Sequence, residues 1–157
     1  MAQQNLANQP EEAPAPAPEK GMSPFEQFDT DPELEVHGVW LDFGGFRLKC
    51  RPSGEDNPDF VRVYNELVDP VREALEQKVL PNAEEVERGF LITAYAETVI
   101  VDADGNFAYP DGKTIPKTVK GFQDVLTKLP RLFRQVRRKT LAVATYRRVR
   151  DNAKGKE

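Results

Sequence analysis

Residues 36–50, VHGVWLDFGGFRLKC, constrain the fold more than any other stretch of this chain. Apolar side chains recur at every second position on both sides of Gly44-Gly45, which is the period of a β-strand. Two glycines suit a tight turn because they accept positive φ without a Cβ clash. The pattern predicts a β-hairpin whose apolar face is formed by Val39, Leu41, Phe43, Phe46, Leu48 and Cys50. Because an isolated hairpin is marginal in water, this face also predicts a covering layer.

Amphipathic segments after the hairpin supply that layer. Apolar residues recur at three- and four-residue spacing, the period of a helix, over residues 58–80, 83–101, 118–128 and 130–148. The pair Asn57-Pro58 starts the first segment, and Pro70 predicts a kink or a split within it. The β-branched run at residues 98–101 is compatible with an extended conformation in place of the end of the second helix.

The domain boundaries follow from composition. Residues 1–24 are rich in alanine and proline and are expected to be disordered, with a ligand for a proline-reading domain as the alternative. Residues 25–34 are acidic and turn-like. A single α+β domain is expected over 25–150, in which the N-terminal hairpin packs on about four helices. Residues 151–157 are expected to form a flexible tail. No apolar run is long enough to span a membrane, so we expect a soluble, cytoplasmic protein.

Signals for catalysis or metal binding are weak. His37 is the only histidine and has no second His or Cys at ligand spacing, so we expect a solvent-touching strand residue. Cys50 is the only cysteine, and no orienting partner or oxyanion motif accompanies it beyond a conceivable pair with His37. Residues 102–116 match a calcium loop only in part because Gly105 stands fourth rather than sixth, so an ordinary turn or small hairpin is expected. We therefore expect neither an enzyme nor a resident cofactor or metal.

Charge is distributed unevenly along the chain. Residues 1–112 hold 8 Lys and Arg against 23 Asp and Glu, a net charge of −15, whereas residues 113–157 hold 14 against 3, a net charge of +11. Much of the positive charge lies on the segment 130–150, which predicts a basic helix. Its partner is either an acidic protein, the acidic half of another copy, or nucleic acid with Tyr146 stacked on a base. A sequence pI of about 5.2 counts against nucleic acid.

Three stretches occur in an order that resembles a known family. They are FDTDPELEVHGVWLDFGGFRLKC, NPDFVRVYNELVDPVREAL and ERGFLITAYAETVIVDADG. Within them stand Asp31-Pro32-Glu33, Gly38-Val39-Trp40, Asn57-Pro58, Pro70 and Ala94-Tyr95-Ala96-Glu97. Over residues 25–136 the chain resembles the tail assembly chaperones of long-tailed, siphovirus-like bacteriophages. It departs from them in lacking a helix-starting Ser/Thr-Pro-Glu in residues 102–116 and in its unusually basic last helix.

This resemblance implies a non-enzymatic function in phage assembly. Such proteins bind the tape measure protein, a long and largely helical chain, and keep it soluble while the tail tube polymerises. They act in the host cytoplasm and are not expected in the mature virion. A virion structural protein of the tail or head–tail junction is the alternative, and a nucleic-acid-binding protein is the third. Other tail proteins and further copies of the chain stay open as partners.

The predicted partner-binding residues combine apolar helix faces with the basic helix. The apolar ones are Phe90, Tyr95, Phe122, Leu126 and Phe133. The basic ones, expected to guide the partner electrostatically, are Arg131, Arg134, Arg137, Arg138 and Lys139.

Overall fold

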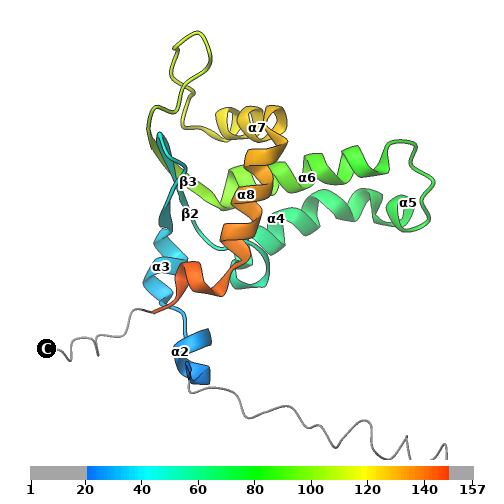
Figure 1. Cartoon of the computed structure of the whole chain (residues 1–157). Coiled ribbons are helices and arrows are strands. Elements are labelled where there is room, and N and C mark those ends of the chain that lie inside the picture. Colours follow the sequence, from blue (N-terminus) through cyan, green and yellow to red (C-terminus); the bar gives the residue numbers. More distant parts are fainter. Residues whose placement is uncertain (1–20, 149–157) are drawn as a thin grey trace, which may run out of the picture.

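The computed structural model describes residues 21–148 (Figure 1). Helices pack against a three-stranded antiparallel sheet, which confirms the predicted α+β class. The predicted tails at 1–20 and 149–157 lie outside the described residues. No helix within residues 21–148 is both long and apolar enough to cross a membrane.

The hairpin has the predicted strands and register. β1 (Val39–Asp42) pairs antiparallel with β2 (Phe46–Cys50), and Leu41 stands opposite Leu48. Gly44 adopts a φ of 101° at the turn, a conformation that a residue with a Cβ rarely takes. Leu41 and Leu48 are both buried, so the apolar face of the hairpin is part of the core.

A third strand completes the sheet and corrects the predicted end of the second helix. β3 (Ile100–Gly105) pairs antiparallel with β2, where the sequence pattern placed a helix to Val101 and a loop from Asp102. α6 (Ala83–Thr98) ends before the strand. Ile100 and Val101, the end of the β-branched run, adopt the extended alternative. Branched side chains fit a pleated sheet better than a helix.

α4 and α6 form a two-helix arm that runs away from the sheet (Figure 1). α4 (Pro58–Val68) begins at Asn57, whose side-chain oxygen accepts a 3.2 Å hydrogen bond from the first turn, as predicted. A 3-10 turn, η2 (Asp69–Val71), contains Pro70 and separates α4 from α5 (Arg72–Glu76), which confirms the predicted interruption.

Residues 25–34, predicted as a turn, instead contain parts of two short helices. α2 (Pro24–Phe28) starts at Ser23 with a capping box, and α3 (Pro32–His37) starts at Asp31. Proline follows each cap because the first helical position needs no N–H donor. Helix α2 thus begins inside the segment predicted to be disordered.

α7 (Val119–Lys128) and α8 (Pro130–Leu141) confirm two predicted helices, but α8 ends before the predicted residue 148. The chain becomes extended at Ala142 and then forms a 3-10 turn, η3 (Val143–Tyr146). Tyr146 is 2% exposed there. The chain leaves the helical path to bury this side chain in the domain.

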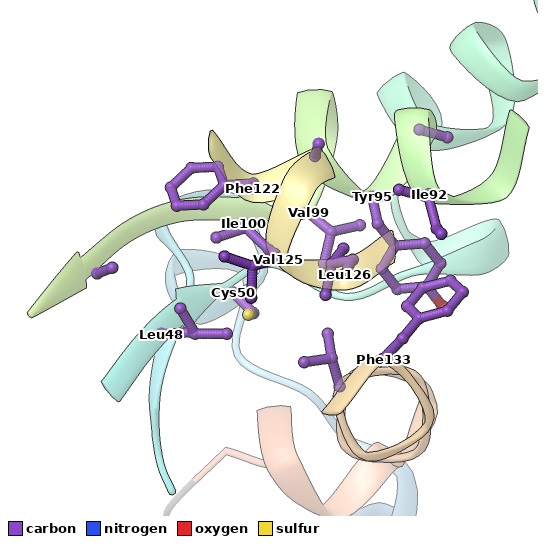
Figure 2. Close-up of a cluster of buried hydrophobic side chains, with 14 of the residues drawn as sticks. Leu48, Cys50, Ile92, Tyr95, Val99, Ile100, Phe122, Val125, Leu126 and Phe133 are labelled. Atoms are coloured by element: carbon purple, nitrogen blue, oxygen red, sulfur yellow. The ribbon is translucent and has the colours of Figure 1, made fainter. Parts of the chain in front are cut away.

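The core lies where the sheet, α6, α7 and α8 meet (Figure 2). The ring of Tyr95 on α6 meets the ring of Phe133 on α8 edge to face, with centroids 5.1 Å apart and planes at 90°. Further core residues labelled in Figure 2 are Leu48, Cys50, Ile92, Val99, Ile100, Phe122, Val125 and Leu126. Helices thus cover the apolar face of the hairpin, as predicted.

Candidate protein-binding surface

Four of the five predicted apolar contact residues lie in the core. Tyr95, Phe122, Leu126 and Phe133 are 2%, 4%, 1% and 3% exposed. Their side chains pack inside the domain, which corrects the prediction of an open apolar face on these helices. Phe90 on α6 is half-buried and reaches the surface. The pattern misled because a helix that packs on its own sheet has the same apolar stripe as one that binds a guest.

The five predicted basic residues lie on the outer side of α8, which carries no acidic residue. Arg131, Arg134, Arg137 and Arg138 are exposed, and Lys139 is half-buried. Within residues 21–148, none of the five forms an ion pair with a carboxylate. Arg137 places its guanidinium 5.7 Å from the Phe133 ring centroid. The unneutralised field of these cations favours an acidic partner.

One edge of α8 faces the hairpin. Arg131, Gln135 and Lys139 are spaced four residues apart, so they follow one side of the helix. They line a hollow of about 470 Å³ whose opposite wall includes Phe43 and Phe46 of the hairpin. This edge therefore combines positive charge with apolar surface.

Leu129 separates this hollow from a second one. It joins α7 to α8 and is 52% exposed. The second hollow measures about 620 Å³ and lies between α7 and the loop that follows β3. We call the two hollows together the Leu129 groove. Its apolar lining residues are Phe43, Phe46, Ala108, Tyr109, Pro110, Ile115, Val125, Leu129 and Leu132.

A polar cluster forms the rim of the second hollow. The Tyr109 hydroxyl donates a 2.9 Å hydrogen bond to Oδ2 of Asp124, and Nζ of Lys128 lies 3.2 Å from Oδ1. The bond from Tyr109, followed by the one from Lys128, holds the pKa of Asp124 below its usual value. The same bond to Asp124 raises the pKa of Tyr109. The carboxylate is thus engaged as a structural acceptor at the edge of the groove.

The loop beside this hollow is held in shape by its own hydrogen bonds. Ala108 and Thr114 form an antiparallel bridge, and the Tyr109 N–H donates to the Lys113 carbonyl at 2.8 Å. The small hairpin predicted for this loop is therefore present, and it gives the groove one preformed wall.

Cys50 and His37 do not form a reactive pair. Cys50 is 0% exposed, and burial raises the pKa of its thiol to about 12. A thiolate is therefore not available at neutral pH. His37 ends helix α3 rather than standing in the predicted strand, and its exposed ring lies 3.4 Å from the Glu33 carboxylate.

In the segment that partly matches a calcium loop, the first acidic residues belong to the sheet. Asp102 and Asp104 lie in β3, and Nε of Arg47 in β2 donates to Oδ1 of Asp104 at 2.9 Å. This hydrogen bond lowers the pKa of the Asp104 carboxyl and raises that of Arg47. Among residues 21–148, no three His, Cys, Asp or Glu side chains gather as a metal site requires.

Tyr146, predicted to stack on a nucleic-acid base, is closed to such a partner. Its buried hydroxyl donates a 2.9 Å hydrogen bond to the Cys50 carbonyl. Arg147 and Arg148, predicted to extend the basic face, turn to the N-terminal segment. Nε of Arg148 lies 3.0 Å from Asp29, for example. Arg150 lies outside the described residues. Within residues 21–148, the basic face consists of the α8 cations.

Leu129, which borders both hollows, was not among the predicted contact residues. The available signal was Pro130, because a residue before proline is pushed out of the helical conformation. Leu129 indeed has φ −123° and ψ 78°, outside both helices. Comparison of the chain with protein-family models, with curated proteins and with solved structures finds no match.

Proposed function

We propose that this protein is a tail assembly chaperone of a long-tailed bacteriophage, which binds the tape measure protein and keeps it soluble while the tail tube forms. The proposal draws on the order of motifs over residues 25–136, which resembles that family. It places the protein in the host cytoplasm during assembly and outside the finished virion.

The Leu129 groove is the observation that carries this proposal. A long, largely helical guest needs a receptor that accepts apolar side chains without enclosing a whole ligand. Here an exposed leucine stands between two hollows of about 470 and 620 Å³ with apolar linings. The cations Arg131 and Lys139 stand at one side. Such a surface suits an amphipathic helix whose polar side is acidic.

Electrostatic attraction and apolar packing have different roles at this surface. The cations speed encounter with an acidic segment and set its orientation, whereas burial of apolar side chains in the groove supplies affinity. Because the guest is long, many weak contacts of this kind would hold it by avidity. A catalytic group has no part in this function.

Co-expression tests the proposal. The proposal expects a tape measure gene immediately downstream; the product of that gene is produced alone and together with this protein, and its soluble fraction is measured. We expect the tape measure protein to aggregate alone and to co-purify in soluble form with the chaperone. A tape measure protein that is equally soluble alone, or that does not bind, contradicts the proposal. Finding the chain in stoichiometric amounts in purified particles would instead support the virion structural alternative.

Nucleic-acid binding is the third reading of the sequence, and it is favoured by the five cations of α8, which form no ion pair within residues 21–148. Its distinguishing property is retention on DNA that weakens steeply with salt, because bound phosphates release counterions. The same preparation can be passed over immobilised double-stranded DNA. Retention of the protein on DNA, without binding to the tape measure protein, would indicate that the basic helix binds nucleic acid.

A further inference from the structure

The second edge of α8 has a composition of its own. Arg134, Arg137 and Arg138 share one flank of the helix, at a spacing of three and four residues. Lys139 lies on the other flank, whereas Arg131, about two turns before Arg138, lies nearly in line with it. Together with Leu141, the three arginines of the first flank line a hollow of about 370 Å³. Leu141 is 57% exposed. We call Arg134, Arg137, Arg138 and Leu141 the outer edge of α8.

This outer edge continues toward the arm without being neutralised by it. Arg134 and Arg137 also line a hollow of about 450 Å³ with Glu87 and Leu91 of α6. Glu87 forms no ion pair there, and neither do the two arginines, among residues 21–148. Within residues 21–148, the three guanidinium groups of the outer edge therefore have no paired carboxylate.

The far end of the arm has the opposite charge. Residues 58–98 hold nine Asp and Glu against four Lys and Arg. Glu76 ends α5, and Glu84 and Glu85 stand in the first turn of α6. None of these three forms an ion pair within residues 21–148. Val79 between them is 64% exposed. We call residues 76–85 the arm tip.

One copy cannot bring these two surfaces together. The arm tip lies at the end where α4, α5 and α6 meet, and α8 crosses the arm nearer to the sheet (Figure 1). Helix α8 is fixed there by the contact of Phe133 with Tyr95. The three carboxylates and the three guanidinium groups therefore remain apart unless another molecule supplies the partner surface.

We propose that the arm tip of one copy docks on the outer edge of α8 in a second copy. Carboxylates of the tip would face Arg134 and Arg138, and Val79 would lie beside Leu141. Because the two surfaces differ, the contact is heterologous: a pair of copies keeps one free arm tip and one free outer edge. Such a contact builds an open head-to-tail series unless its rotation closes a ring. This inference does not rest on the proposed chaperone function.

Sedimentation of the full chain over a series of concentrations tests the proposal. We expect wild-type protein to self-associate at low salt and to dissociate as salt is raised, because the pairs are solvent-exposed. Two variants, R134Q/R138Q and E84Q/E85Q, remove one surface each. Each is expected to weaken self-association by about tenfold. Far-UV circular dichroism and thermal melting establish that both variants are folded.

Mixing the two variants gives the sharpest result. The intact arm tip of R134Q/R138Q can still bind the intact α8 of E84Q/E85Q, so the mixture is expected to form a 1:1 heterodimer that grows no further. R134K/R138K keeps the charge and is expected to restore the series. K139Q removes a charge from the flank of α8 that lines the hollow beside the hairpin and is expected to self-associate like wild type.

Several outcomes would overturn the proposal. They are a wild-type chain that stays monomeric at low salt, an oligomer that is insensitive to both glutamine variants, and a mixture without heterodimer. None of these measurements involves the tape measure protein, so a failure here leaves the proposed function to its own test.

Discussion

The hydroxyl of Tyr95 donates a 2.8 Å hydrogen bond to Oγ of Ser53, and both side chains are buried. Oγ of Ser53 also lies 2.9 Å from Oγ1 of Thr140 on α8. A line of three hydroxyls thus ties α6 to the loop after β2 and to α8. Because buried polar groups cost free energy when they are unpaired, this line fixes the relative position of the helices rather than a partner.

Replacing Tyr95 with phenylalanine is expected to lower the free energy of unfolding by about 1–2 kcal/mol, since Ser53 loses a buried hydrogen-bond partner while the ring is kept. Urea unfolding measures the change. The matched control is Tyr64→Phe, because Tyr64 is only half-buried and its hydroxyl forms no hydrogen bond within the described residues. Equal effects at the two positions would contradict this role for Tyr95.

Asn57 combines a helix cap with a buried network. Its Oδ1 accepts from the first turn of α4, and its Nδ2 donates to the carbonyls of Pro52 at 2.9 Å and Thr98 at 3.0 Å. Aspartate is as good a cap as asparagine in general. Here N57D would aim a buried carboxylate at two carbonyls, so we expect a loss of about 3 kcal/mol or more.

The control for this prediction is T118D. Thr118 caps α7 with a 3.1 Å bond from the Gly121 N–H, but it is exposed. An aspartate there meets the positive end of the helix dipole, so stability is expected to stay within about 1 kcal/mol of wild type. Chemical denaturation compares both variants, and a mild effect of N57D would show that capping alone matters at position 57.

Substitution by alanine is expected to have opposite effects on stability at two glycines. A Cβ on Gly121 would lie 2.0 Å from the Pro116 carbonyl oxygen, whereas a Cβ on Gly89 in α6 would meet nothing within 4 Å. G121A is therefore expected to destabilise the domain severely. G89A is expected to stabilise it by about 0.5–1 kcal/mol because alanine favours the helix. Melting temperatures of the pair test this prediction, and equal shifts would contradict it.

Alkaline pH is expected to destabilise the fold through Cys50. Burial raises the pKa of its thiol from 9.0 to about 12 in the native state. Between these values the unfolded chain releases a proton that the native chain retains. Stability from this group is therefore complete below pH 9 and falls as pH rises, by up to about 1.4 kcal/mol per pH unit.

The measurement compares the wild-type chain with C50A. Denaturant unfolding at several pH values between 8 and 11 is expected to show a steeper alkaline loss in wild type, because other groups that titrate in this range are common to both chains. The native thiol is also expected to resist alkylation at pH 8 until denaturant is added. Parallel pH profiles would mean that Cys50 is accessible.

Local signals explain which parts of the fold could be predicted from the sequence. The strand period around Gly44-Gly45, the cap at Asn57 and the break at Pro70 depend on residues a few positions apart, and the structure contains all three. The formation of β3 depends instead on pairing with the free edge of β2, a strand far away in the sequence. The end of α8 depended on the burial of Tyr146 against Cys50.

At the candidate site too, some features could be predicted from local sequence and others depend on tertiary packing. Charge is visible in the sequence, and the predicted cations do lie on the surface of α8. Which apolar residues remain outside cannot be deduced from periodicity. Leu126 and Leu129 are three residues apart, the spacing of neighbours on one helix face, yet they are 1% and 52% exposed. Tertiary packing assigns the first to the core and the second to the groove.

Leu129 and Leu141 allow the two proposed contacts to be separated. They are 52% and 57% exposed and lie at the two ends of α8, so replacing either with aspartate is expected to leave the domain folded and to change its stability by about 1 kcal/mol or less. L129D puts a carboxylate between the two hollows and is expected to reduce co-purification of the tape measure protein while self-association persists. L141D puts a carboxylate beside Arg138, where it repels the acidic arm tip, and is expected to weaken self-association while guest binding persists. Co-purification and sedimentation of the same two proteins give both readouts, and a variant that loses both activities while staying folded would show that one surface serves both partners.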